Sequence, residues 1–174
     1  LVPYCHEDFE KWTQSLHFGA DGRFNTVHKE TNLKIGGGLD DVWLNTKTGY
    51  VHIVDYKSTS QKTPGKRITL EDWWKSSYKR QMDIYIWVMR RLGIRTSDTG
   101  YFLYCDGDRF TNKIFLGEEG ATMQFKITLL PYEADLSWIE PALFRIKTIL
   151  SLKICPSHSN GCEYGIFIDG VKDI

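Results

Sequence analysis

The sequence predicts a mixed α/β domain in which helices flank a central β-sheet. Three observations predict this fold class. Runs rich in β-branched and aromatic residues, such as residues 50–57, alternate along the chain with helical patterns such as residues 70–92. The length of 174 residues suits a single domain, residues 1–174, with a substantial core. Hydrophobic residues make up 41% and charged residues 25%, a balance that is typical of globular proteins and argues against disorder.

The first predicted elements are a short helix and two strands. Apolar residues recur at spacings of three and four over residues 7–17, which predicts an amphipathic helix. Residues 23–30 and 33–35 follow a turn rich in glycine and aspartate, and they alternate in the manner of strands. Because the chain begins at Leu1 rather than at Met, a missing N-terminal element is an open alternative.

A β-hairpin is predicted next. Residues 39–44 form its first strand, residues 45–49 its turn and residues 50–57 its second strand, which is rich in β-branched and aromatic side chains. Three glycines at 36–38 precede the hairpin. Glycines in a row pack nothing, but they permit the close approach of another backbone or a ligand.

A long helix is predicted over residues 70–92, after a loop at 61–69 that contains proline, glycine and several cations. Aromatic and apolar residues recur along it every three or four positions. Acidic residues in its first turns and arginines in its last turn suit the helix dipole. Gly93 follows as a stop signal.

The rest of the chain predicts two strands and a helix. Residues 100–105 and 122–130 have strand-like composition, with residues 106–108 as a turn. Residues 135–153 place apolar side chains on one helical face. The tail, residues 155–174, is rich in glycine and polar residues, and we assign no element to it.

The charge is balanced overall but unevenly distributed. A formal net charge of zero argues against a generally basic nucleic-acid binder. Residues 56–95, however, contain ten Lys or Arg and three Asp or Glu. A basic face on a neutral protein is compatible with a phosphate-backbone partner, whereas the alternative is an ordinary solvated helix with its loop.

Composition also bears on the compartment. No apolar run is long enough to span a membrane, and no signal peptide is visible. The four cysteines are sparse and irregularly spaced for a disulfide scaffold. We therefore expect an intracellular, cytoplasmic protein with no membrane partner.

The strongest chemical pattern is Asp55-Tyr56-Lys57. Side chains alternate along a strand, so Asp55 and Lys57 lie on one face, at the end of an apolar run. A surface ion pair is the alternative that this pattern alone leaves open. Asp40 lies on the partner strand and falls beside Asp55 if the turn places the strand ends opposite each other. The turn length leaves this register open.

Two converging carboxylates form a hard-oxygen site that suits Mg²⁺. Such an ion polarises a phosphodiester and lowers the pKa of a bound water, while a nearby lysine orients that water or stabilises developing charge. Asp41 points to the other face of its strand, so we expect it to support the site indirectly or to face solvent.

A second group of candidates lies on the long helix. Gln81 and Tyr85 are four residues apart and share one face. Gln81 would reach a metal-bound water or nucleic acid; the alternative is that Tyr85 is core and Gln81 satisfies a buried backbone group. Lys75, Lys79 and Arg80 flank them, and we expect these cations to contact the phosphate backbone of DNA.

Taken in order, these motifs resemble the PD-(D/E)xK nuclease superfamily over residues 24–105, and its RecB-like branch fits best. That branch includes the CRISPR-associated exonucleases of RecB type. The matching residues are Gly38-x-Asp40-x-Val42, then Ile53-Val54-Asp55-Tyr56-Lys57-Ser58, then Gln81-x-x-x-Tyr85.

The resemblance implies a fold and an activity. It implies a restriction-endonuclease-like core, a central mixed sheet flanked by helices, and cleavage of DNA that depends on Mg²⁺ or Mn²⁺. It further implies that Asp40 and Asp55 are metal ligands and that Lys57 is the catalytic lysine. Gln81 and Tyr85 match the helix motif that lies beside the active site in that branch.

The chain departs from the branch at its histidines. Members often carry a metal-binding histidine in an upstream helix. The candidates are His6, His17 and His28, and none has a context that matches. His28 lies nearest the hairpin, and we expect it to be a strand residue on a solvated face.

The chain also departs at its cysteines, because many relatives hold an iron–sulfur cluster. The ligands that this chain offers for such a cluster, or for zinc, are Cys5, Cys155, His158 and Cys162. The spacing C-x₂-H-x₃-C is not a standard one, so we expect isolated thiols instead.

The sequence therefore predicts a metal-dependent deoxyribonuclease. We expect an exonuclease that acts in DNA repair, recombination, or phage- or CRISPR-related processing. The first alternative is a non-catalytic nucleic-acid-binding module on the same fold, which keeps the basic helix without using the acids. The second alternative is an interaction domain stapled by a metal at the cysteines.

Overall fold

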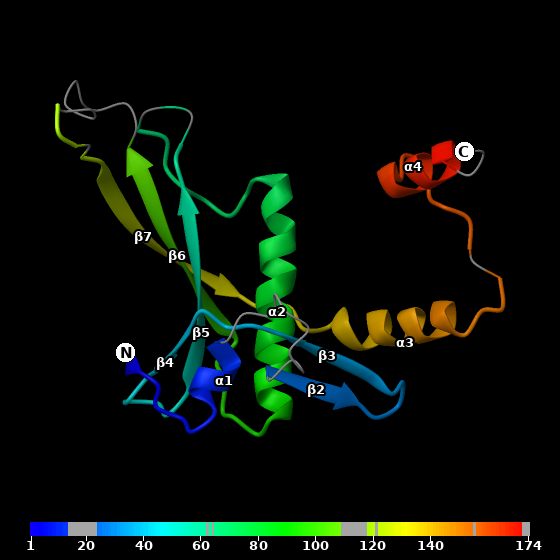
Figure 1. Ribbon diagram of the computed structural model, residues 1–174. Helices are drawn as coiled ribbons and strands as arrows, with labels where there is room; N and C mark the ends of the chain where they lie inside the picture. The colour runs from blue at the N-terminus through cyan, green and yellow to red at the C-terminus, as the bar shows by residue number, and fades with distance from the viewer. Residues whose placement is uncertain are drawn as a thin grey trace.

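The structure is a computed structural model, and it describes residues 1–13, 24–61, 63, 65–108, 118–120, 122–154 and 156–171. Its centre is a five-stranded sheet with the strand order β1-β4-β5-β6-β7 (Figure 1). Its strands are Val2–Pro3 (β1), Asp41–Leu44 (β4), Val51–Thr59 (β5), Thr99–Asp108 (β6) and Gln124–Glu133 (β7). Helices flank this mixed sheet, which confirms the predicted fold class.

The sheet is mixed because β5 and β6 pair in parallel, whereas the other neighbouring pairs are antiparallel. A parallel pair requires a crossover connection. The helix α2 (Ser76–Arg91) supplies it, after a short 3₁₀ segment at Trp73–Lys75. The α-helix thus begins at Ser76 rather than at residue 70, because Lys75 folds back onto Asp72 and holds the chain in a tighter turn.

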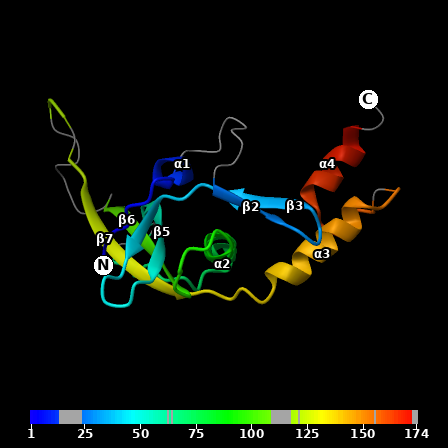
Figure 2. The same ribbon diagram turned by 90° about the horizontal axis from the view of Figure 1, so that it is seen from below.

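The helix α2 is buried between two layers. One side of it lies against β5, and the other lies against the hairpin of β2 (Phe24–His28) and β3 (Leu33–Gly37), as Figure 2 shows. Gly37 is required at this contact, since a Cβ there would lie 2.3 Å from a ring carbon of Tyr85. The largest fully buried side chains include Phe24, Phe102, Leu39, Ile53, Met82, Ile86 and Met89.

The turn between β4 and β5 fixes the register of that hairpin. The side-chain oxygen of Asn45 accepts hydrogen bonds from two backbone N–H groups within the turn. Gly49 has a φ of +73°, a conformation that favours glycine. Leu44 consequently lies opposite Val51. This is the register, left open by the sequence, that places the two acids together.

The second half of the chain differs from two predictions. Residues 106–108 continue β6 instead of forming a turn, because they pair with the start of β7. The tail forms a helix, α4 (Glu163–Val171), where the sequence predicts no element. The predicted helix at 135–153 is α3, Ile139–Leu150. Figures 1 and 2 show that α3 and α4 extend away from the sheet.

The N-terminal segment packs onto the same core. The helix α1 (Phe9–Thr13) buries Trp12, whose carbonyl accepts a hydrogen bond from the Leu39 N–H, just before Asp40. Residues 7 and 8 of the predicted helix at 7–17 form a turn, and residues 14–17 lie outside the described residues. Within the described ranges, none of the helices combines the length and the apolar character that crossing a bilayer requires.

Candidate active site

Asp40 and Asp55 lie side by side at the open end of the β4–β5 hairpin. Asp41 pairs with Val54, so Asp40, directly before β4, faces Asp55 on the neighbouring strand. Oδ2 of Asp40 accepts a 2.7 Å hydrogen bond from the backbone N–H of Tyr56. The Asp40 carboxylate is therefore tied to the strand that carries Asp55.

Asp55 ends the buried half of β5, and only 3% of it is exposed. Burial raises the pKa of its carboxyl; the Lys57 ammonium opposes the rise, and the charge of Asp40 adds to it. That ammonium lies 2.5 Å from Oδ2 of Asp55 as an ion pair. Apart from it, this buried oxygen has no hydrogen-bond partner among the described residues.

Lys57 is held between a carboxylate and an aromatic ring. Besides its contact with Asp55, its ammonium lies 4.4 Å from the ring centre of Tyr78, on α2. A cation over a ring face is attracted to it. Tyr78 is a residue that the sequence analysis missed, although it lies three positions before Gln81 and so shares its helical face.

Asp41 occupies the opposite face of the sheet, as the alternation of strand side chains predicts. Its Oδ2 accepts hydrogen bonds from Trp43 Nε1 at 2.8 Å and from the Tyr56 hydroxyl at 2.5 Å. Burial and this hydrogen bond raise the pKa of Tyr56 to about 12. Asp41 therefore connects β4 and β5 on the face of the sheet opposite the site. Asp40 and Asp41, although adjacent in sequence, have separate surroundings.

Gln81 and Tyr85 contact each other on α2. The Gln81 amide donates a 2.9 Å hydrogen bond to the Tyr85 hydroxyl. Tyr85 is 9% exposed and packs edge-on against Phe24. The ring of Tyr85 thus belongs to the core, which was the alternative that the sequence left open. Gln81, however, hydrogen-bonds to the Tyr85 hydroxyl and not to a backbone group.

The three cations expected to contact DNA differ in exposure. Arg80 is exposed and Lys79 is partly exposed on α2. Lys75 is only 3% exposed; its ammonium lies 2.8 Å from Asp72 and donates a 2.6 Å hydrogen bond to the Thr69 carbonyl. Lys75 is therefore not an exposed helix cation, because the segment before α2 closes over it.

The structure places two of the three candidate histidines. His6 stacks on Trp12 at 4.4 Å between ring centres. His28 is 1% exposed, and its Nε2 lies 2.6 Å from Glu140 of α3. The expectation of a solvated His28 is wrong, because α3 covers that end of the β2–β3 hairpin. His17 lies outside the described residues.

The two cysteines of the candidate metal-binding set that the structure describes, Cys5 and Cys162, lie far apart. Cys5 is exposed near the N-terminus, whereas Cys162 lies just before α4, and Figures 1 and 2 place these segments at opposite ends of the molecule. The Cys162 sulfur lies 3.9 Å from Nδ1 of His158. Cys155 is outside the described residues.

The pair of acids fits a divalent cation bound partly by other ligands. Among the described residues, no three His, Cys, Asp or Glu side chains form a group that could hold a metal ion. Asp40 and Asp55 supply two carboxylates, one of which has a buried oxygen paired only with an ammonium. Mg²⁺ is commonly held by one or two carboxylates, with waters and substrate phosphates completing its coordination.

Comparison with known proteins agrees with this geometry. A family model described as the PD-(D/E)XK nuclease superfamily matches residues 4–165. No curated protein and no solved structure matches the chain. The match covers far more than half of the sequence and includes the whole β4–β5 hairpin and α2. The chain therefore belongs to the PD-(D/E)XK nuclease superfamily.

Proposed function

We propose that this protein is a metal-dependent nuclease that hydrolyses phosphodiester bonds in DNA. The observation that carries the proposal is the meeting of Asp40 and Asp55 across the hairpin, with the Lys57 ammonium against the buried oxygen of Asp55. Superfamily membership supports nuclease chemistry on a nucleic acid.

Asp40 and Asp55 are the residues that would hold Mg²⁺ or Mn²⁺. The ion would polarise the phosphodiester and make water a stronger nucleophile near neutral pH. The backbone N–H of Tyr56 fixes the orientation of the Asp40 carboxylate toward this position. A raised pKa at Asp55 reflects a carboxylate that is poorly compensated by its surroundings, which is the condition under which a cation binds with most benefit.

Lys57 has a separate role in the proposal. Its ammonium is positioned by Asp55 and by the Tyr78 ring, so it does not depend on solvent for its orientation. A fixed ammonium stabilises negative charge that develops on a phosphate oxygen in the transition state. Gln81 and Tyr85 support the site as a hydrogen-bonded pair one helical turn apart, which is the basis for proposing the RecB-like branch.

The proposal extends to the mode of cleavage and the cellular process. We infer an exonuclease in DNA repair, recombination, or phage- or CRISPR-related processing, on the ground of the motifs shared with the RecB-like branch. We also propose an intracellular location. Among the described cysteines, Cys5, Cys105 and Cys162 are free thiols, as is usual in a reducing compartment.

The test is cleavage of linear and circular DNA, single- and double-stranded, in the presence of Mn²⁺ or Mg²⁺. We expect wild-type protein to degrade linear DNA from its ends. Lys57→Ala should lower the rate by about 10²- to 10⁴-fold, because it removes a charge that acts on the reacting phosphate. Lys47→Ala, in the exposed turn of the hairpin, is the matched control and should retain the wild-type rate.

Two results would count against the proposal. If wild-type protein binds DNA but leaves every substrate intact with Mn²⁺, the non-catalytic module is the correct alternative. If circular DNA is cut as fast as linear DNA, the activity is endonucleolytic and the exonuclease role is wrong.

A further inference from the structure

A polar cavity lies next to the proposed active centre, at the carboxyl end of β5 and beside the middle of β6. Its volume is about 340 Å³, near the lower end of the range for small-molecule sites. It is formed by the last residues of β5, the loop that follows, the 3₁₀ segment and one residue of β6. The lining residues that matter here are Thr59, Gln61, Asp72, Trp74, Lys75 and Tyr104.

The wall of the cavity contains a buried tyrosine hydroxyl that lacks a hydrogen-bond partner among the described residues. Tyr104 is 2% exposed, and its hydroxyl has no hydrogen-bond partner among the described residues. A buried polar group without a partner costs free energy, so a retained one needs an explanation. Tyr104 lines the cavity together with Asp72, so this buried hydroxyl belongs to a residue of the cavity wall.

An aromatic face forms another part of the wall. Trp74 is 45% exposed and lines the cavity, whereas its neighbour Trp73 is 87% exposed and does not. The Lys75 ammonium lies 4.9 Å from the Trp74 ring and is already paired with Asp72. A partly exposed indole ring in the cavity wall suits stacking by a flat ring such as a nucleobase, while Lys66, which also lines the cavity, is a cation near the backbone of such a ligand.

Packed side chains connect the wall of the cavity to the proposed active centre. Tyr104 is the register partner of Lys57 on the adjacent strand. The Trp74 ring lies 5.7 Å from the Tyr78 ring, which in turn lies 4.4 Å from the Lys57 ammonium. Only one aromatic ring thus separates the cavity wall from the lysine at the scissile position.

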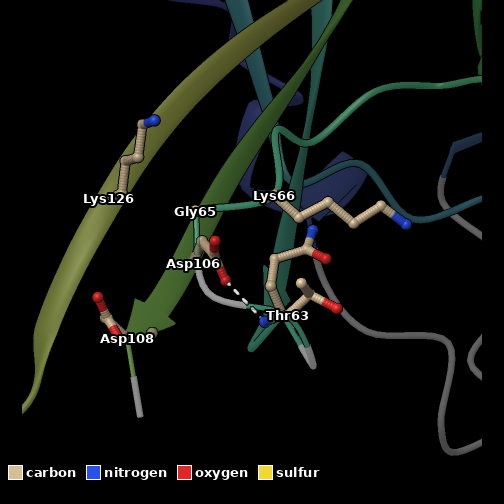
Figure 3. Close-up of a pocket in the computed structure, with 8 residues that line it drawn as sticks. Thr63, Gly65, Lys66, Asp106, Asp108 and Lys126 are labelled. Atoms are coloured by element: carbon tan, nitrogen blue, oxygen red, sulfur yellow. Dashed lines mark hydrogen bonds between the residues drawn. The ribbon is translucent and has the colours of Figure 1, made fainter. Parts of the chain in front are cut away.

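A second, smaller hollow adjoins the cavity. This hollow shares Gln61 and Lys66 with it and is also lined by Asp106 and Lys126. Figure 3 shows the ammonium groups of Lys66 and Lys126 pointing in different directions, away from the Asp106 carboxylate. The hollow therefore does not concentrate positive charge, and a phosphate is not its natural occupant.

We infer that the cavity binds one unpaired nucleobase of a single-stranded nucleic acid, stacked on Trp74 and hydrogen-bonded to the Tyr104 hydroxyl, beside the phosphate that is cleaved. The inference rests on the proposed nuclease function, which it deepens by naming single strands as the substrate. A base that occupies the cavity cannot be paired, so a blunt duplex is excluded from it. Bases stack on aromatic side chains irrespective of their sequence, so the site selects strandedness and not a particular base.

The test measures binding in Ca²⁺, with a fluorescently labelled single-stranded oligonucleotide of twelve bases. A series of probes carries one abasic position at each place along the strand. Wild-type protein should show one place at which the missing base weakens binding by about 5- to 150-fold, the loss expected for one stacked base. We call this position-specific loss of affinity the dip. It should be absent in Trp74→Ala, present in Trp73→Ala and present in Trp74→Phe, which restores an aromatic ring.

A second variant probes the hydroxyl alone. Tyr104→Phe keeps the ring and should weaken binding of the intact oligonucleotide by about 2- to 12-fold, the effect of one hydrogen bond. The same variant should leave the binding of a blunt duplex unchanged.

The inference is overturned if wild-type protein shows no position-dependent loss, if Trp74→Ala retains the dip, or if a blunt duplex binds as tightly as the single strand. These outcomes are independent of the nuclease proposal, which is judged by cleavage in Mn²⁺. A protein that cleaves DNA but shows no dip refutes only the base cavity. A protein that shows the dip without cleaving refutes only the catalytic role.

Discussion

Two buried aspartates of this protein have the same exposure and very different surroundings. Asp55 in β5 and Asp83 in α2 are each 3% exposed, and burial raises the pKa of both carboxyls. Asp83 accepts hydrogen bonds from Trp138 Nε1 at 2.9 Å, the Tyr132 hydroxyl at 3.0 Å and the Asp135 N–H at 3.1 Å. Among the described residues, the buried oxygen of Asp55 has only the Lys57 ammonium as a partner.

The difference separates an acid with several hydrogen-bond donors from the acid that we propose as a metal ligand. Asp83 ties α2 to β7 and to the segment before α3, and its donors offset the cost of burying its charge. The buried oxygen of Asp55 has a single partner among the described residues, so the cost of burying its charge is offset less fully, and a bound cation would offset more of it. The contrast is testable by placing the same substitution at both positions.

Cleavage should separate the two aspartates most strongly. Asp55→Asn should lower nuclease activity by at least about 100-fold, because the loss of even a residue that supports a metal ligand costs about 10- to 100-fold. Asp83→Asn should retain the wild-type rate per folded molecule, as measured with the same linear DNA and Mn²⁺. Equal losses in the two variants would show that Asp55 is no more than a structural acid.

Metal binding should separate them next. Mn²⁺ at about 100 times its dissociation constant should stabilise wild-type protein by about 2.7 kcal/mol. For a chain of this size each kcal/mol raises the Tm by about 2–4 °C. Asp83→Asn should show the same upward shift from its own lower Tm, whereas Asp55→Asn should show little or none. A full shift in Asp55→Asn would remove that residue from the metal site.

Stability without metal should rank the variants in the reverse order. Asp83→Asn should lower the free energy of unfolding by about 1–3 kcal/mol. The asparagine amide replaces one accepting oxygen of Asp83 by an NH₂ group, so at least one of the three donors loses its acceptor. Asp55→Asn should leave that free energy unchanged or raise it, since the amide removes a poorly compensated buried charge. Urea unfolding of the metal-free proteins measures both, and a clear loss in Asp55→Asn would contradict this account.

The smallest expected effect is on pH dependence. A carboxyl whose folded-state pKa is raised stabilises the fold at pH values below its unfolded pKa, and this contribution is lost as the pH rises through the folded value. Asn does not titrate. The metal-free stability of Asp55→Asn relative to wild type should therefore grow as the pH rises above the ordinary aspartate pKa of 3.8, and vanish below it. A difference that shrinks with rising pH would mean that the sign of the shift is wrong.

The central features of the site were predictable because they depend on local rules. Alternation along β5 placed Asp55 and Lys57 on one face, and alternation along β4 placed Asp41 behind the sheet. Helical spacing placed Gln81 beside Tyr85. These features follow from residues close in sequence, and the turn that joins Asp40 to Asp55 is only a few residues long.

The errors arose where distant segments decide the outcome. His28 is buried because Glu140 of α3 reaches it from far along the chain, which no strand pattern contains. Residues 106–108 belong to β6 because β7 offers pairing partners there, which overrides their turn-like composition. Lys75 is buried because the preceding loop folds over it, whereas helical periodicity alone made it a surface cation.

The turn between β4 and β5 limits how this protein can vary. It lies at the far end of the hairpin from the two acids, and its own side chains touch neither of them. Yet a shift of one residue in its length would carry the side chain of Asp40 to the opposite face of the sheet. We therefore expect related chains that keep Asp40 opposite Asp55 to conserve the length of this turn, together with its Asn45 and Gly49.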